Sequence, residues 1–128
     1  MSFEQEFQKW LVSALPERAP GGVVAFSFNL YEPALVDGVK FGVEVVGTSE
    51  FDPEDEDWAC EEVWEPSKRQ LHIPIEFSGA DWETCQSRVK DLLLQVLQSE
   101  NKSSSVLKST RGIGVGFVDG SIDIIWQP

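Results

Sequence analysis

VVAFSFNLYEPALVDGVKFGVEVV, residues 23–46, decides the fold of this chain. Apolar residues alternate with other residues in its first and last thirds, which predicts strands at 23–32 and 39–46 with one apolar face each. Asp37 and Gly38 supply the turn chemistry between them. Two strands joined by a short loop predict an antiparallel hairpin. The alternating apolar residues are Phe26, Phe28 and Leu30, then Phe41, Val43 and Val45.

Two helices flank this hairpin in the sequence. Residues 2–15 and 81–98 each carry apolar residues at three- and four-residue spacing, which places them on one helical face. Ser2 and Gln5 fit a capping box at the first helix, and Pro16 follows its end. Asp81 or Ser78 can cap the second helix. Its predicted apolar stripe consists of Trp82, Cys85, Val89, Leu92, Leu93, Val96 and Leu97.

Further strands are predicted at 71–77, 114–118 and 121–126. Asp119-Gly120 between the last two predicts a hairpin turn. The polar, Ser-rich stretch 99–105 predicts a mobile loop. The whole pattern predicts one α+β domain over residues 1–128, with a mainly antiparallel sheet of about five to six strands and two helices packed on one face.

The glycines of the run RGIGVGF, residues 111–117, fall at alternate positions of a predicted strand. The run lacks the Gly-Lys-Ser/Thr ending of a phosphate loop, and no helix follows it. Alternate glycines instead predict that another element, most simply a helix, packs closely across that face of the strand.

Composition limits the class of protein. The chain has 128 residues with 41% hydrophobic residues, which suits one packed core. No stretch approaches the roughly 20 apolar residues of a membrane span. The first ten residues, MSFEQEFQKW, lack the basic and apolar regions of a signal peptide, which favours a cytoplasmic protein without membrane partners. Cys60 and Cys85 are expected to be free thiols.

The negative charge is concentrated in residues 50–65, named here the acidic segment. The chain carries a net charge of −12, and nine acids without a single base lie in this segment, which leaves only −3 for the rest of the chain. This excess disfavours DNA or RNA as a partner, because nucleic-acid binding needs a basic surface. Pro53 and the repulsion between like charges argue against regular structure in its first half. The second half can form a short strand or a helical turn.

Metal binding and catalysis have little support in the sequence. An EF-hand loop starting at Asp52 requires glycine at its sixth position, where Asp57 stands. His72 with Cys60 and Cys85 shows neither zinc-ligand spacing nor a catalytic pairing. We therefore expect no metal site, no cofactor and no catalytic residue.

Three blocks of the sequence resemble a known group of proteins: FNLYE (28–32), VGTSEFDPEDEDWACEEV (46–63) and GVGFVDGSIDIIW (114–126). They resemble small acidic bacterial proteins, mostly uncharacterised, some of which are similar to immunity proteins of polymorphic or contact-dependent toxin systems. The resemblance implies a cytoplasmic binding protein and identifies neither a partner nor a contact residue.

Charge and resemblance lead to one main hypothesis and two alternatives. The main hypothesis is an immunity protein that neutralises a basic toxin or nuclease domain by stoichiometric occlusion. The first alternative is a structural or regulatory interaction protein, including a homo-oligomer, whose acidic segment serves only solubility. The second is a carboxylate-dependent enzyme. The candidate partner-binding residues are Glu50, Asp52, Glu54, Asp55, Glu56, Asp57, Trp58, Glu61, Glu62 and Trp64.

Two alternatives are open for the tryptophans at the ends of this segment. Trp58 and Trp64 can anchor a partner, because aromatic residues often dominate interfaces. They can equally hold the acidic segment against the core of the protein itself.

Overall fold

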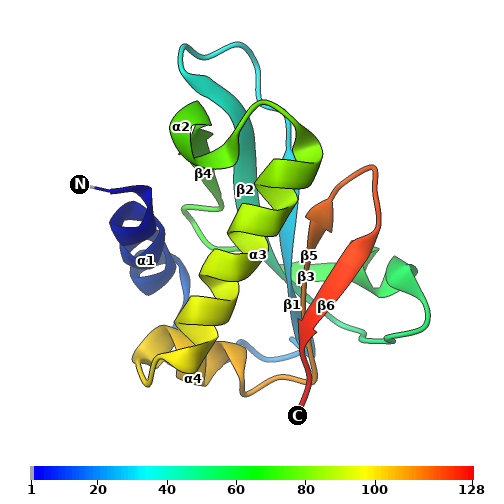
Figure 1. The fold of residues 1–128 in the computed structure, drawn as a ribbon. Helices are drawn as coiled ribbons and strands as arrows, with labels where there is room; N and C mark the ends of the chain where they lie inside the picture. The colour runs from blue at the N-terminus through cyan, green and yellow to red at the C-terminus, as the bar shows by residue number, and fades with distance from the viewer. Residues whose placement is uncertain (1) are drawn as a thin grey trace.

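Helices α1 and α3 lie across one face of a six-stranded mixed sheet in the computed structural model, which describes residues 2–128 (Figure 1). The short helices α2 and α4 lie at the two ends of α3, and the protein is a single α+β domain. The helices are α1 (Phe3–Ala14), α2 (Ile75–Ser78), α3 (Trp82–Gln98) and α4 (Lys102–Leu107), with a 3-10 helix η1 (Glu56–Cys60). The strands are β1 (Ala25–Tyr31), β2 (Val39–Thr48), β3 (Glu62–Trp64), β4 (Gln70–Pro74), β5 (Ile113–Phe117) and β6 (Ile122–Trp126).

The sheet is mainly antiparallel, as predicted. Strand β2 pairs in antiparallel fashion with β1, β3 and β4, and the C-terminal hairpin joins β5 to β6. The β1–β2 hairpin predicted from residues 23–46 is confirmed, with Phe28 opposite Val45. The β1–β5 pair is parallel, which makes the sheet mixed. This pairing places the C-terminal hairpin beside β1, and β6 at the edge of the sheet.

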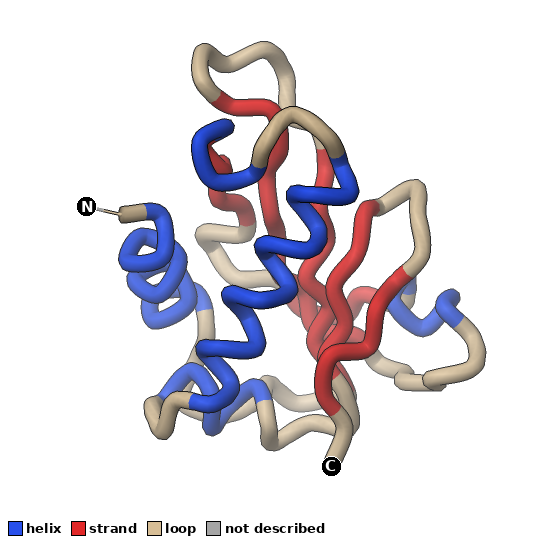
Figure 2. Tube along the Cα trace, in the orientation of Figure 1, coloured by secondary structure: helices blue, strands red, loops and turns tan. Residues whose placement is uncertain are grey.

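The hydrophobic core lies between the sheet and the helices. The aromatic ring of Phe28 on β1 lies 6.4 Å from that of Phe7 and 6.5 Å from that of Trp10, both on α1. Val89 and Leu93 of α3 are fully buried against the same face. The capping box of Ser2 and Gln5 and the Asp81 cap of α3 form as the sequence predicts. Figure 2 shows α3 in front of the strands and α1 at their left.

The prediction of a strand over 71–77 is wrong in its second half. β4 ends at Pro74, and residues 75–78 turn into α2. The backbone N–H of Ile75 donates to the carbonyl of Gly38 at 2.8 Å, which fixes the turn. Phe77 then packs on Phe3 with ring centroids 4.7 Å apart. The alternation of apolar residues continues beyond the end of β4, which is why the sequence predicted a longer strand.

The prediction of a mobile loop at 99–105 is wrong from Lys102 onward. Asn101 forms a capping box with Ser104, so that α4 begins at Lys102. Val106 and Leu107 are buried in the core, and Ser103 and Ser104 are buried with them. A Ser-rich composition therefore conceals a helix that begins at a strong N-cap and is held by two apolar residues.

Because side chains alternate along strands, the other face of the sheet carries the remaining residues of each strand. Ser27 and Asn29 of β1 share that face with Gly114 and Gly116 of β5. No α-helix in the described part of the chain covers it, and η1 lies on this side (Figure 1). No helix among residues 2–128 combines the length and the apolar character needed to cross a membrane.

Candidate functional site

Two aromatic side chains hold the acidic segment against the uncovered face of the sheet. Trp58 is only 2% exposed, and its ring lies 5.0 Å from that of Phe51 in an edge-to-face arrangement. A Cβ at Gly114 would lie 2.9 Å from Trp58, and a Cβ at Gly112 would overlap the ring of Phe51. The glycine run therefore leaves room for these two rings. The sequence predicted that a helix packs on this face of β5. The element that does so is the 3-10 helix η1, together with Phe51.

Local hydrogen bonds shape the backbone of the segment. The N–H of Glu54 donates to Asp52 Oδ1 at 2.9 Å, and the N–H of Asp57 donates to Asp55 Oδ1 at 3.1 Å. Asp55 is thereby the N-cap of η1. These are turns that Asp side chains favour. Both structures predicted for the second half of the segment occur in succession, η1 and then β3.

A contact between distant parts of the chain fixes η1 to the C-terminal hairpin. Glu56 Oε1 accepts a hydrogen bond of 3.2 Å from the backbone N–H of Ile122, the first residue of β6. The N–H of Ser49, just before the segment, donates to the carbonyl of Glu61 at 2.9 Å and closes the segment around η1. The acidic segment is thus a pinned structure rather than an unattached loop.

Arg69 neutralises the C-terminal end of the segment. Its guanidinium contacts Glu62 at 2.6 Å, Glu65 at 3.1 Å and Glu44 of β2 at 2.9 Å. Burial alone would raise the pKa of Glu44, but hydrogen bonds from Arg69 and Asn29 outweigh it and lower that pKa below its ordinary value. The hydrogen bond to Glu44 in turn raises the pKa of Arg69.

The other carboxylates of the segment have no cation beside them. Within residues 2–128, only Glu62 and Glu65 of the nine acids form an ion pair. Four acids also make no side-chain hydrogen bond in this described range, and all four are exposed. These are Glu50, Glu54, Asp57 and Glu61.

A groove of about 440 Å³ separates η1 from the turn between β5 and β6. We name it the acidic groove, because the carboxylates of Glu56, Asp57, Glu62 and Asp119 line it. Its remaining walls are Asn29, Ala59, Cys60, Phe117, Val118, Gly120 and Ile122. Apolar walls with carboxylates suit a Lys or Arg side chain, which has an apolar stem and a cationic head.

The predicted site residues therefore have different environments. Asp52, Asp55 and Glu56 shape the segment, while Asp57 and Glu62 line the groove. Trp58 is buried, and Trp64 packs edge-to-face on Phe26 at 5.9 Å, so both hold the segment on the fold.

Sequence analysis missed the residues outside the segment that complete the site. Arg69, Glu44, Asn29 and Asp119 come from four other parts of the chain. The alternate glycines were the one available indication that the uncovered face receives other residues.

Metal-binding clusters are not found among residues 2–128, where no group of three or more His, Cys, Asp or Glu residues is placed to hold an ion. The thiols of Cys60 and Cys85 are both free. Cys60 lines the acidic groove, whereas Cys85 lies in the core on the helical side of the sheet. Comparison with protein-family models, curated proteins and solved structures finds no match.

The two cysteines are expected to differ sharply in reactivity. Burial, and then the charge of Asp81, raise the pKa of Cys85 to about 12, so its thiolate is scarce at neutral pH. Cys60 is exposed. A chromogenic disulfide reagent should modify one thiol in the native protein and the second only after unfolding. The Cys60→Ser variant should lose the fast reaction, and a fast phase that survives this change would contradict the assignment.

Proposed function

We propose that this protein is a non-enzymatic, cytoplasmic binding module of the immunity-protein type, which neutralises a basic protein by covering its cationic surface. The observation that carries the proposal is the combination of a pinned backbone with unneutralised carboxylates beside the acidic groove. A flexible acidic loop would have to be ordered on binding, at a cost in conformational entropy. This one is already held in place.

The physical advantage for a basic partner is twofold. Like charges confined to one surface repel each other, by about 1 kcal/mol per pair at about 4 Å in water, and a cationic partner relieves that repulsion. The same field attracts the partner over a distance and speeds association at low salt. Lys and Arg residues that enter the acidic groove would then be unavailable for contacts to phosphate. That mechanism suits a basic toxin or nuclease domain, the partner of the main hypothesis.

The test compares two variants that remove the same charge from different places. One replaces Glu50, Glu54, Asp57 and Glu61, whose side chains form no ion pair or hydrogen bond within residues 2–128, by Gln or Asn. The matched control replaces four exposed acids elsewhere in the chain, Glu6, Glu17, Asp91 and Glu100. A basic partner captured from the source organism with the wild-type protein and then purified supplies the ligand. Association rates are measured at about 50 mM and about 500 mM salt.

We expect the first variant to associate about tenfold more slowly than wild type at low salt, and the control variant to change much less. High salt should reduce the difference between wild type and the first variant. Protection of Cys60 from the thiol reagent in the complex would locate the contact at the acidic groove. Equal association of wild type at the two salt concentrations would show that the acidic segment does not guide the partner.

A further inference from the structure

Exposed apolar side chains gather at one end of the molecule. Of the seven large hydrophobic residues that are exposed among residues 2–128, five lie on the β1–β2 loop, α2, the start of α3 and the β5–β6 turn. These elements share the upper end of the molecule in Figure 1. The five residues, named here the apolar end, are Leu35, Val36, Ile75, Trp82 and Val118, with exposed fractions from 39% to 106%.

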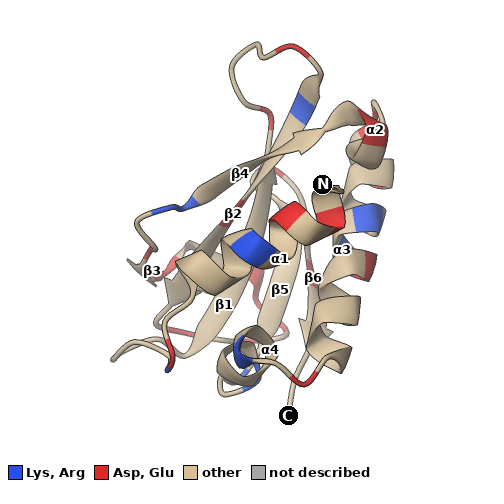
Figure 3. Cartoon of the chain, turned by 90° about the vertical axis from the view of Figure 1, so that its left-hand side faces the viewer, with Lys and Arg blue, Asp and Glu red and all other residues tan. Residues whose placement is uncertain are grey.

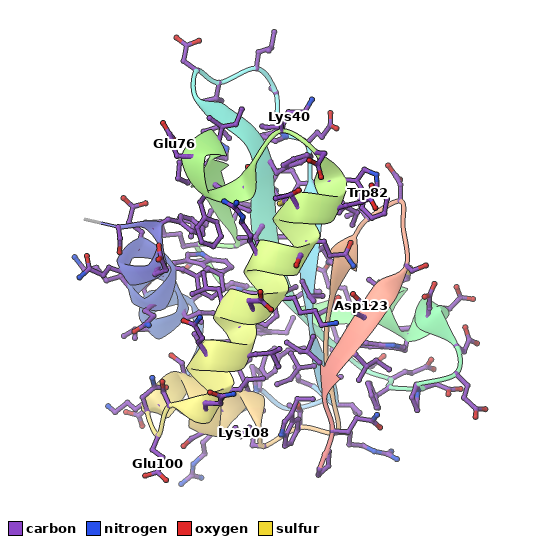
Figure 4. All side chains as sticks on the ribbon, in the orientation of Figure 1. Lys40, Glu76, Trp82, Glu100, Lys108 and Asp123 are labelled. Carbon is purple, nitrogen blue, oxygen red and sulfur yellow. The ribbon has the colours of Figure 1, made fainter. Side chains whose placement is uncertain are left out.

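Contacts within the fold join these residues into one region. Ile75 donates its N–H to Gly38, two residues beyond Val36. Trp82 packs edge-to-face on Phe117, beside Val118, at 6.2 Å, and Phe117 packs on Phe41 at 5.2 Å. In Figure 4, Lys40 lies between Glu76 and Trp82 at this end. The elements that carry the apolar end are therefore in contact with one another at this end of the molecule.

Exposed acids stand next to the residues of the apolar end in the sequence, and we name them the acidic rim. They are Asp37 after Leu35 and Val36, Glu76 after Ile75, Asp81 and Glu83 on either side of Trp82, and Asp119 after Val118. Figure 3 shows acidic residues on the β1–β2 loop and on α2, with one basic position on the adjoining part of β2. That base is Lys40, which lies 3.9 Å from Glu32.

The negative charge of the acidic rim favours some binding partners of the apolar end over others. A second copy would bring the same acids face to face across a two-fold axis, and like charges at an interface cost several kcal/mol. An anionic lipid surface would be repelled in the same way. An apolar surface with a charged rim otherwise has the anatomy of a protein interface. The matching partner presents apolar side chains flanked by Lys or Arg.

We infer that the apolar end is a second contact surface for the basic partner, and that this partner is amphipathic, with an apolar anchor next to its cationic residues. The inference rests on the proposed function, because it assigns a further contact to the same partner. The β5–β6 turn joins the two surfaces, since Val118 and Asp119 line the acidic groove and also belong to the apolar end and its rim. One partner can therefore cover both.

The test uses two synthetic peptides of equal length and equal positive charge. One is an amphipathic peptide of Leu and Lys, and in the other every Leu is replaced by Ser. The protein variants are Leu35→Ser with Trp82→Ser, and Leu35→Ser alone, which touches a fully exposed side chain and leaves the fold intact. Val12→Ser is the matched control, because Val12 is 68% exposed on α1 and lies outside the apolar end. Binding is measured by calorimetry and by backbone amide chemical shifts.

Wild type is expected to bind the Leu/Lys peptide about tenfold or more tightly than the Lys/Ser peptide. Shift changes should cover residues 35–36, 75, 82 and 118. Each variant of the apolar end should lose affinity for the Leu/Lys peptide only, and Val12→Ser should not. Equal affinity for both peptides, or unchanged binding by both variants, overturns the inference. Self-association or binding to anionic vesicles that the same variants abolish would also overturn it.

The four-acid variant separates this inference from the proposed function. If that variant loses affinity for both peptides while the apolar-end variants bind like wild type, the inference fails and the proposed function stands. If neither kind of variant changes the binding of either peptide, both fail.

Discussion

Trp58→Ala is expected to lower the free energy of unfolding by about 3–5 kcal/mol, the usual range for removing a buried large aromatic side chain. The indole is 2% exposed and fills the space above Gly114, so its loss leaves a cavity between η1 and the sheet. Phe51 loses its edge-to-face partner in the same step. Chemical denaturation followed by circular dichroism measures the change.

The matched control for this prediction is Trp82→Ala. Trp82 is 57% exposed, so its removal should cost about 1 kcal/mol or less. Amide hydrogen exchange adds a local readout, because residues 51–61 should exchange faster in Trp58→Ala and not in Trp82→Ala. Similar destabilisation by the two changes would mean that Trp58 does not hold the acidic segment on the sheet.

Local patterns predicted those parts of the fold whose contacts are close in the sequence. The β1–β2 hairpin and α3 follow from alternation and helical spacing, and both form with the expected faces. The parallel pairing of β1 with β5 was not predictable in this way, because it joins strands from opposite ends of the chain. A short-range pattern contains no information on which distant strand lies beside β1.

The errors at α2 and α4 have a different cause. Ile73, Ile75 and Phe77 keep the period of a strand, but a contact from Ile75 to Gly38 and the packing of Phe77 on Phe3 favour a helical turn. At α4, the cap formed by Asn101 and the burial of Leu107 outweigh the weak helix propensity of the serines. Tertiary contacts decided both segments.

The candidate site was predictable in its charge and not in its geometry. Nine acids in residues 50–65 are evident from the sequence. That Arg69 binds Glu62, Glu65 and the distant Glu44 depends on the register of β2 against β4, which the sequence does not reveal. The same holds for Asp119, which the C-terminal hairpin brings to the groove.

Arg69→Met is expected to lower the free energy of unfolding by about 2–4 kcal/mol at neutral pH. Met keeps the apolar stem of Arg69 but leaves the carboxylate of Glu44, whose side chain is 11% exposed, without its cation. The range lies below that of a fully buried pair because the Arg69 side chain is 27% exposed to solvent. Lys40→Met is the matched control. It breaks a longer and more exposed pair with Glu32, so its effect should stay within about 0.5 kcal/mol.

The dependence of this effect on pH identifies Glu44 as its source. In wild type, the pKa of Glu44 is lower in the folded than in the unfolded state, so its contribution to stability is present above the unfolded pKa of about 4.3 and is lost as the pH falls through the folded pKa. In Arg69→Met, burial without the guanidinium raises the folded pKa, and protonation then favours the folded state. The gap in stability between wild type and variant should therefore narrow as the pH falls from about 7 to about 3.

Adding Glu44→Gln to Arg69→Met should recover part of the loss at neutral pH, because no buried charge is left unpaired. A gap that stays constant with pH, or a double variant no more stable than Arg69→Met, would place the role of Arg69 in its exposed contacts with Glu62 and Glu65 instead.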